Sequence, residues 1–435
     1  MDRSTFSPTD IVRELWTNLG LPKHAASAVR LEAGPGPAAP SSFKIGHIAQ
    51  SSIALSALTA ALLHSHRNGV VALPRVAVPL RHAFVEFRSE RLYEMEGDTP
   101  KSAWGDVGGL HRTLDGHTTG TERGLAIYAL RTYEEWDSHP QSASVADQPI
   151  LPRKLADGPG GFPEHLAKGA DRCLRGLRVP RDRRAAPVAG KTLAAHGADV
   201  LWVTSPNLPD QPPLDREFAR GKRTIRLDID KPPDKAELLA LLRTADVFVQ
   251  GCRPGSLAAR GLSPAELAAA NPRLIVANLS AFGPDGPWSG RRGFESLVQT
   301  CSGMNVSEAR HHGAGEPARP LPCRALDHGA GYLLAAGISA ALYRRATEGG
   351  SWIVDVSLAG VMEYLRSLGQ YPGRTGFEAS EAERSFQADE NLFEKRMTGF
   401  GVMKYLRHSA AVEGLGPGWD VMPKPLGSDE PRWLT

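Results

Sequence analysis

The stretches GADVLWVT (197–204), IRLDI (225–229) and ADVFVQ (245–250) decide the fold of this chain. Each contains a run of apolar residues that is long enough for one buried strand, and residues 235–243 before the third run have helical spacing. Strands that alternate with helices of about ten residues are typical of βαβ units. The sequence therefore predicts an α/β fold built on a parallel sheet.

The alternation continues toward the carboxyl terminus. We expect a helix at 264–270, a strand at 274–279, a long apolar helix that follows Asp327 and runs to about Tyr343, and another strand at 353–356. These elements extend the same sheet, so one large domain is expected to cover the middle of the chain.

The two ends of the chain do not show this alternation. Near the amino terminus, we expect helices at 9–19 and 48–66, short strands within 70–87 and a turn at 108–116. The stretch 141–170 is rich in Pro and Gly, and we expect it to be a loop-like link. The expected parts are a small, shortened α+β domain with its link at 1–160, the large domain at 161–372, and a partly irregular tail at 373–435.

Composition excludes several classes of protein. The chain has 435 residues, and 51 basic against 48 acidic residues give a net charge of +3, which argues against a dedicated nucleic-acid binder. The cysteines Cys173, Cys252, Cys301 and Cys323 lie far apart without a CxxC pair, so neither a zinc site nor a disulfide framework is expected. The longest apolar run, 53–63, is too short to cross a membrane. We expect a cytoplasmic protein that binds neither nucleic acid nor membrane.

Residues 185–192 nearly match the phosphate-binding pattern G-x-x-x-x-G-K-[ST]. The first glycine is replaced by Ala185, and the charged run 181–184 precedes the motif where a buried strand is required. A nucleotide-binding P-loop is therefore the least favoured interpretation.

Two further segments could bind a ligand. The turn 250–255 directly follows the strand expected at 247–249, and ligands bind at the carboxyl ends of parallel strands. The basic run 216–226 lies at a turn next to the sheet, where Arg and Lys would suit a phosphate group. A plain Gly/Pro turn and a solvated charged surface are the other interpretations, and both remain open.

Asp327 is the most informative acidic residue because it stands at the start of the long apolar helix. A carboxylate in this position can cap the helix. It can also be a nucleophile, because Gly329 and Gly331 would leave room for a thioester beside it. The residues alone do not decide between the two.

Seven ordered motifs between about Ala185 and Leu358 resemble the family III CoA-transferases, the carnitine and bile-acid CoA-transferase family. They are A-x-P-x-A-x-x-x-L-x-x-x-G-A-D-V ending at Val200, G-K-R-T-I-x-L-D from Gly221, A-D-V-F-V-Q-G-x-R-P-G from Ala245, N-P-R-L-I-V-A-N-L-S-A-F-G from Asn271, R-R-G-F-E-S-L-V-Q-T-x-S-G from Arg291, A-L-D-H from Ala325 and G-S-W-I-V-D-V-S-L from Gly350.

The resemblance implies a Rossmann-like large domain, an interlocked homodimer and Asp327 as the nucleophile. CoA would move between an acyl-CoA thioester and a carboxylic acid through an aspartyl anhydride and an enzyme-CoA thioester, with no metal and no tightly bound cofactor. The resemblance also implies a set of CoA-contacting positions. These are Arg184, Lys222, Gly251, Cys252, Arg253, Arg260 and Arg292.

The same fold also serves acyl-CoA racemases, which need a second proton-transferring group. In those enzymes a histidine and an acid occupy the positions matched by Phe294 and Glu295, and Phe294 cannot transfer a proton. His328 adjoins Asp327 in sequence, but neighbouring side chains normally point in different directions. A transferase is therefore preferred over a racemase.

Two departures from the family pattern leave a non-catalytic member open, one that retains CoA binding or only dimerisation. The family-like pieces at 109–116 and 135–141 are separated by only about 18 residues, so part of the smaller domain is expected to be missing. The segment 177–184 contains Pro180 and several charges, and we expect that it cannot form a central buried strand.

Overall fold

A seven-stranded sheet forms the centre of the computed structural model, which describes residues 1–32, 34, 36–96, 126–145, 149–166, 168–182, 187–378 and 389–434. The strand order is β4-β10-β9-β8-β5-β6-β7, and every neighbouring pair is parallel except β4 and β10. The expected α/β fold is confirmed. The strands are β4 (Leu151–Ala156), β5 (Arg178–Asp182), β6 (Asp199–Thr204), β7 (Lys222–Arg226), β8 (Val247–Gln250), β9 (Ile275–Ser280) and β10 (Ser351–Ser357).

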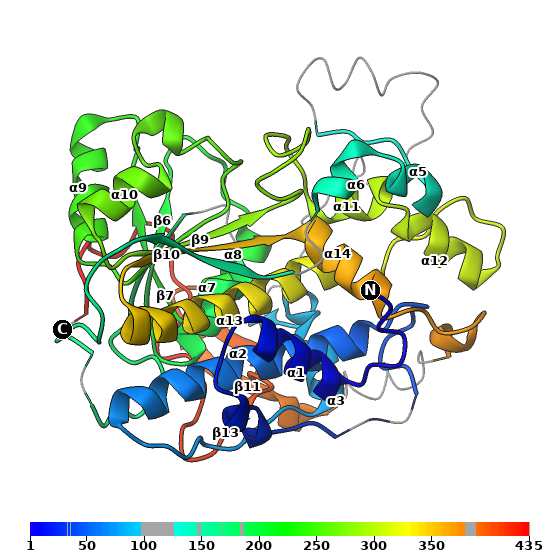
Figure 1. Ribbon diagram of the computed structural model, residues 1–435, viewed down its shortest axis with the longest axis horizontal. Coiled ribbons are helices and arrows are strands. Elements are labelled where there is room, and N and C mark those ends of the chain that lie inside the picture. The colour runs from blue at the N-terminus through cyan, green and yellow to red at the C-terminus, as the bar shows by residue number, and fades with distance from the viewer. Residues whose placement is uncertain are drawn as a thin grey trace.

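Helices cover both faces of this sheet, as a parallel sheet requires (Figure 1). On one face, α9 (Pro232–Arg243) and α10 (Pro264–Ala270) pack through buried leucines against β8 and β9. On the other, α7 (Pro187–Ala195) and α13 (Ala325–Glu348) lie against the sheet, and α2 (Ile45–Asn68) packs on α13. The remaining helices are α1 (Pro8–Asn18), α3 (Leu80–Glu86), α5 (Tyr133–Asp137), α6 (Pro140–Ser144), α8 (Pro212–Phe218), α11 (Glu295–Cys301), α12 (Met304–His312) and α14 (Leu358–Ser367), with 3₁₀ turns η1 (Lys23–Ala28), η2 (Ser89–Arg91), η3 (Ala258–Arg260), η4 (Thr375–Phe377) and η5 (Glu390–Leu392).

By length and composition, helix α2 could cross a membrane, although the apolar run 53–63 within it was expected to be too short. In the structure, 94% of its most apolar 18-residue segment is buried inside the protein. Its apolar surface is used for packing against α13, as in the core helix of a globular domain.

The segment around Pro180 forms β5, a central strand, so the prediction that it could not do so is wrong. Strand β5 pairs with β6 along its whole length, but its ladder with β8 is confined to Arg181 opposite Val249. The weak ladder on one side tolerates a proline, which has no N–H to donate. Arg181 is fully buried and its guanidinium stacks on the Trp202 ring of β6 at 4.7 Å, which makes a charge acceptable inside the sheet.

Both ends of the chain combine into two small sheets. One has the order β1-β2-β13 and the other β11-β12-β3, so strands of the tail pair with strands of the amino-terminal segment. The tail is therefore more regular than expected. The strands are β1 (Val29–Arg30), β2 (Val76–Ala77), β3 (Glu94–Met95), β11 (Phe393–Thr398), β12 (Gly401–Leu406) and β13 (Ala411–Val412).

Two expectations for the first 170 residues need correction. Short strands were expected within 70–87, and β2 lies there, but residues 80–86 form the helix α3. The expected link contains α6 and the sheet strand β4, whose half-exposed charged residues suit an edge strand and resemble a loop in sequence. The turn expected at 108–116 lies outside the described residues.

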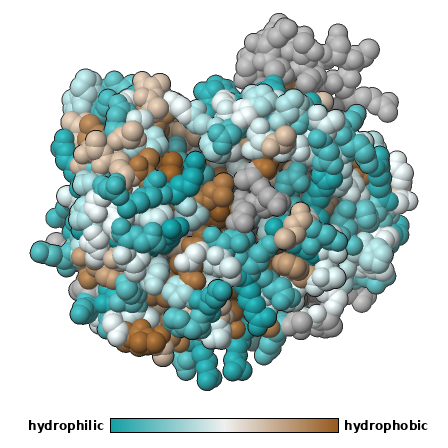
Figure 2. Space-filling view, viewed as in Figure 1, coloured by the Kyte–Doolittle hydropathy of each residue, from teal (hydrophilic) through white to brown (hydrophobic). Residues whose placement is uncertain are grey.

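The molecular face in Figure 2 is mainly hydrophilic, and its apolar patches are interrupted by polar side chains.

Candidate active site

Asp327 is the third residue of α13 and lies at the carboxyl edge of the central sheet. The other end of α13 leads through Gly349 and Gly350 into the start of β10, so the amino end of the helix lies at the opposite edge. A helix of 24 residues is about 36 Å long. A seven-residue strand such as β10 spans only about 23 Å. The first turn of α13 therefore projects beyond the ends of the strands.

The buried carboxyl group of Glu295 lies directly against this first turn. Its oxygens accept hydrogen bonds from the backbone N–H groups of Leu326 at 3.0 Å and Asp327 at 3.3 Å, and from the Gln299 side chain at 2.9 Å. Glu295, the first residue of α11, thus satisfies amides that a helix start leaves without partners. The structure assigns this capping to Glu295, which leaves the Asp327 carboxyl available for another role.

The two carboxyl groups influence each other's protonation. Burial and the adjacent Asp327 charge raise the pKa of Glu295 well above its ordinary value. Burial also raises the pKa of Asp327, but the nearby charges of Arg324 and His328 oppose this rise. The pKa of Glu295 is raised further than that of Asp327, so Asp327 is the member of the pair that ionises more readily. An ionised carboxylate is the form that can attack a carbonyl carbon.

His328 points away from Asp327 and toward the amino-terminal segment. Its Nε2 lies 3.0 Å from Glu90 Oε2, and its ring stacks on Phe87 with a centroid separation of 5.3 Å. Burial alone would raise the pKa of Glu90, but its hydrogen bond to His328 and the charges of His328 and Arg324 lower it to about 2. His328 is thus occupied by Glu90, as expected of a sequence neighbour that faces another way.

The glycines after Asp327 serve helix packing, so the idea that they leave room for a thioester is wrong. A Cβ atom on Gly331 would lie 2.5 Å from Val188 Cβ of α7. A Cβ atom on Gly329 would lie 3.2 Å from Val361 Cγ1 of α14 and 3.6 Å from Ile48 Cγ1 of α2. The space beside both glycines is already filled by neighbouring helices.

Several of the expected CoA-contacting positions lie on loops at the carboxyl ends of β8 and β9. Gly251 and Cys252 directly follow β8, and the Cys252 thiol donates to Asp182 Oδ2 at the end of β5 at 2.8 Å. Arg253 follows them and is exposed. The loop after β9 carries Arg292, also exposed. These positions therefore lie along one edge of the sheet, the edge to which Asp327 also belongs.

The other three expected positions are placed differently. Arg260 lies on η3 and pairs with exposed Asp230 at 2.7 Å. Lys222 is buried at the start of β7, where its ammonium group donates to the Pro187 carbonyl at 2.7 Å and burial lowers its pKa. In this conformation Lys222 faces the protein interior. Arg184 lies outside the described residues.

The position of Lys191 contradicts the interpretation of residues 185–192 as a P-loop. This lysine is buried in α7, and its ammonium group lies 2.7 Å from Glu217 Oε1 and 3.1 Å from Ser89 Oγ. A P-loop lysine must instead reach the phosphates of a bound nucleotide. Among the described residues, no group of three His, Cys, Asp or Glu side chains could hold a metal ion.

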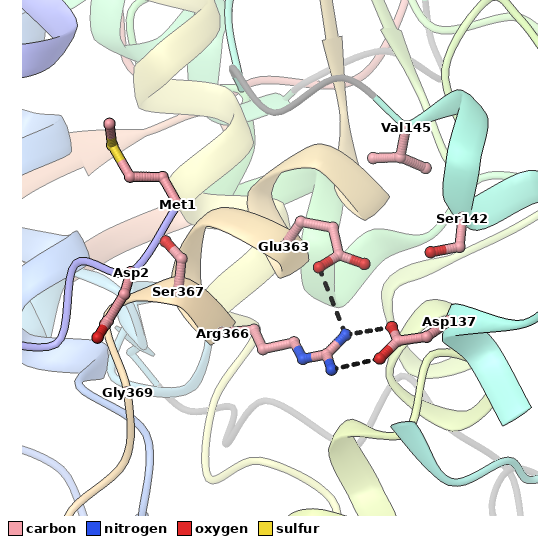
Figure 3. Close-up of a pocket in the computed structure, with 9 residues that line it drawn as sticks. All are labelled: Met1, Asp2, Asp137, Ser142, Val145, Glu363, Arg366, Ser367 and Gly369. Atoms are coloured by element: carbon pink, nitrogen blue, oxygen red, sulfur yellow. Dashed lines mark hydrogen bonds and ion pairs between the residues drawn. The ribbon is translucent and has the colours of Figure 1, made fainter. Parts of the chain in front are cut away.

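A cavity of about 410 Å³ lies between α14, the α5–α6 region and the amino terminus, apart from Asp327 (Figure 3). Arg366 lines this cavity, and its guanidinium donates two hydrogen bonds to the Asp137 carboxylate, at 2.5 and 2.7 Å. Glu363 lies 3.7 Å from the same guanidinium and accepts a hydrogen bond from Trp136. The wall therefore holds one guanidinium group between two carboxylates, an arrangement that differs from the carboxyl pair at Asp327.

Glu90 and the capping role of Glu295 were missed from the sequence. Glu295 carried a signal, because it stands at the acid position of the related racemases. Glu90 carried none, since it lies 238 residues away from His328 along the chain.

Comparison with known proteins points to one family. Residues 182–392 match the model of CoA-transferase family III. The probable fatty acyl-CoA transferase of Mycobacterium tuberculosis is 33% identical over 196 residues, covering 42% of this chain and 49% of that protein. An acyl-CoA transferase of Gibberella moniliformis is 32% identical (54% and 43% covered), and a formyl-CoA:oxalate CoA-transferase of Rhodopseudomonas palustris is 34% identical (41% and 44% covered).

The chain spans about half the length of the curated relatives it matches. Among solved structures, a hypothetical protein from Mycobacterium tuberculosis is 27% identical, with a TM-score of 0.40 and coverage of 53% of this chain and 63% of that one.

Proposed function

Because residues 182–392 belong to CoA-transferase family III, we propose that this chain moves CoA between an acyl-CoA thioester and a carboxylic acid. The observation that carries the proposal is the carboxyl pair at the start of α13. There, Glu295 accepts hydrogen bonds from the helix amides, and Asp327 is the carboxyl group whose pKa is raised less. The named relatives act on acyl-CoA substrates, which agrees with this chemistry.

In the proposed reaction, the Asp327 carboxylate attacks the thioester carbonyl carbon of the donor. The C–S bond breaks, CoA leaves as a thiolate, and an aspartyl mixed anhydride forms. The thiolate then attacks the aspartyl carbonyl carbon, which releases the donor acid and leaves CoA on Asp327 as a thioester. The acceptor carboxylate attacks this thioester, the C–S bond breaks, and an anhydride between Asp327 and the acceptor forms while CoA leaves as a thiolate. The thiolate finally attacks the acceptor carbonyl carbon of this anhydride, which gives the new acyl-CoA and restores the Asp327 carboxylate.

The surrounding residues have distinct proposed roles. Glu295, buried and protonated, keeps a second negative charge away from the nucleophile and holds the first turn of α13. The exposed arginines Arg253 and Arg292, with Gly251 and Cys252, are proposed to contact CoA from the loops after β8 and β9. Arg184, Lys222 and Arg260 are the remaining proposed contacts, and Lys222 would have to leave its bond to Pro187 to make one.

A member that binds CoA or only dimerises, without turnover, is the second candidate function, and the expected shortening of the smaller domain between residues 109–116 and 135–141 motivates it. The expected loss of the first strand no longer supports this candidate, because residues 178–182 form β5. A racemase remains less favoured because Phe294 has no proton to transfer, although its ring is 60% exposed. We also propose a cytoplasmic localisation and an interlocked homodimer, and light scattering of the purified chain would test whether it is a dimer.

The decisive experiment is to incubate the protein with an acyl-CoA and hydroxylamine and to locate the product by mass spectrometry. Hydroxylamine traps an aspartyl anhydride or thioester, so a hydroxamate at Asp327 is expected. Asp327→Asn should abolish the trapped product and lower turnover by a factor on the order of 10⁴. Asp157→Asn is the matched control, because Asp157 is 95% exposed. Unchanged turnover in Asp327→Asn contradicts the mechanism, and CoA binding without turnover in the unmodified protein supports the second candidate.

A further inference from the structure

The side chain of His328, the residue next to Asp327, is held by the amino-terminal segment. Its Nε2 lies 3.0 Å from Glu90 Oε2, and its ring stacks on Phe87 with a centroid separation of 5.3 Å. Its other ring nitrogen, Nδ1, is buried and has no hydrogen-bond partner among the described residues. Glu90 and Phe87 both lie outside residues 182–392, which match the family model. A segment outside the family match therefore fixes a ring beside the proposed nucleophile.

The contact between Glu90 and His328 is a buried pair of opposite charges, with side chains that are 4% and 1% exposed. A carboxylate removed from water is costly unless it is paired. Burial opposes the ionisation of Glu90, but the hydrogen bond to His328 and the charges of His328 and Arg324 lower its pKa to about 2. Glu90 is therefore ionised at neutral pH, and its negative charge stabilises a positive charge on the imidazole.

Four charged or titratable groups face the Asp327 carboxyl group from the elements packed around it. Arg324 precedes α13, His328 belongs to its first turn, Glu90 belongs to η2 and Glu295 begins α11. Burial raises the pKa of Asp327, the charges of Arg324 and His328 lower it, and the charge of Glu90 raises it by less than His328 lowers it. The Glu90–His328 pair as a whole therefore favours the ionised form of Asp327. Without Glu90, the buried imidazole would lose its anion and favour its neutral form.

We propose that Glu90 is a positioning residue of the Asp327 site, which holds His328 and its positive charge beside the nucleophile and so keeps the nucleophile ionised. The proposal rests on the proposed function, because this charge matters to a reaction that begins with the Asp327 carboxylate. The imidazole donates to Glu90 and points away from Asp327. It therefore supplies positive charge without a hydrogen bond that would occupy the attacking oxygen atoms.

The test is the pH dependence of turnover by the full chain, measured with acetate as acceptor and the best donor among acetyl-, butyryl- and benzoyl-CoA. Turnover that needs the Asp327 carboxylate falls as the pH drops through the pKa of this group. Glu90→Gln keeps the size of the side chain and removes its charge. We expect kcat/KM at pH 5.5, relative to its value at pH 8, to fall about three- to ten-fold below the same ratio in the parent, since one pKa unit changes the ionised fraction by up to about tenfold. His328→Gln leaves Glu90 charged beside Asp327 and should shift the profile further.

Glu86→Gln is the matched control, because Glu86 forms a similar buried pair with His408 of the tail, at 2.7 Å and with both side chains 1% exposed. Both variants break a buried Glu–His pair, but only Glu90→Gln should move the pH profile. Added to His328→Gln, the same Glu90→Gln change should move the profile back toward lower pH, because the negative charge of Glu90 by itself raises the pKa of Asp327. A purely structural role of Glu90 predicts no such reversal.

Labelling of Asp327 by a water-soluble carbodiimide between pH 5 and 7, read by mass spectrometry, separates the two proposals because the reagent attacks protonated carboxyl groups. If Glu90→Gln raises this labelling while no protein turns over, the role of Glu90 holds and the transferase proposal fails; unchanged labelling without turnover overturns both. If the parent turns over and Glu90→Gln keeps the parent's pH profile, the role of Glu90 is overturned and the transferase proposal stands. If Glu90→Gln does not fold, His328→Gln decides, since a shifted profile or raised labelling supports the proposal and an unchanged one overturns it.

Discussion

Replacing Gly331 by alanine tests how closely α13 approaches α7 beside the proposed nucleophile. The added methyl would lie 2.5 Å from Val188 Cβ and 2.9 Å from Val188 Cγ1. Carbon atoms pack at about 3.5–4.0 Å, so the helices must move apart by roughly 1 Å. Such overpacking costs about 1–3 kcal/mol, and the better helix propensity of alanine offsets about 0.5–1 kcal/mol. We expect the free energy of unfolding to fall by about 1–2 kcal/mol.

Gly329→Ala is the matched control on the same helix. Its methyl would meet the side-chain ends of Val361 and Ile48 at 3.2 and 3.6 Å, which small rotations can relieve. Its stability should therefore stay equal or rise by up to about 1 kcal/mol. Urea unfolding followed by circular dichroism measures both changes, and Val188→Gly, which removes both contacting atoms, should partly rescue Gly331→Ala. If Gly331→Ala is as stable as the parent while Gly329→Ala is destabilised and inactive, the packing argument is refuted and the idea of room for a thioester returns.

Three further changes test the surroundings of the site. Glu217→Gln should cost about 3–5 kcal/mol, measured by urea unfolding, because it leaves the buried Lys191 and Arg220 without their shared carboxylate. Glu295→Gln should become more stable relative to the parent as pH rises above about 4.5. The parent loses folding stability there because the raised pKa of Glu295 makes ionisation of this carboxyl unfavourable in the folded state, whereas Gln does not ionise. Parallel thermal melts of the two proteins from pH 5 to 9 measure this difference. Trp419→Ala should lower stability by about 3–5 kcal/mol, since the ring is buried under the Arg220 guanidinium at 4.1 Å and donates to the Lys191 carbonyl.

Strands of the central sheet could be predicted where they are apolar. The prediction failed where a strand contains polar residues that its surroundings stabilise. Strands β6 and β8 and the first half of β9, residues 275–277, are buried and appear in the sequence as apolar runs. Strand β5 was rejected for Pro180 and Arg181. The compensation for Arg181 comes from Trp202 on the neighbouring strand, which no local pattern reveals.

The candidate site shows the same division between local and distant information. Asp327 was found because its motif is local, and the helix after it is apolar along most of its length. Its capping partner Glu295 is 32 residues away, and the partner of its neighbour His328, Glu90, is 238 residues away. Contacts between such distant residues depend on how the elements pack, so a single sequence gives no direct sign of them.

The segments on either side of the large domain also contribute to the Asp327 site. From the tail, Trp419 donates to the carbonyl of Lys191, whose ammonium bonds to Ser89 of η2. The next residue of η2, Glu90, holds His328 beside Asp327.

Residues 161–372 alone would lose these contacts, together with β4 and the α2 helix that covers α13. We therefore expect this fragment to expose the apolar face of α13 and to aggregate or bind a hydrophobic dye, whereas the full chain does not. A monodisperse, cooperatively unfolding fragment that still traps hydroxamate at Asp327 would show that the site needs only the central sheet and its own helices.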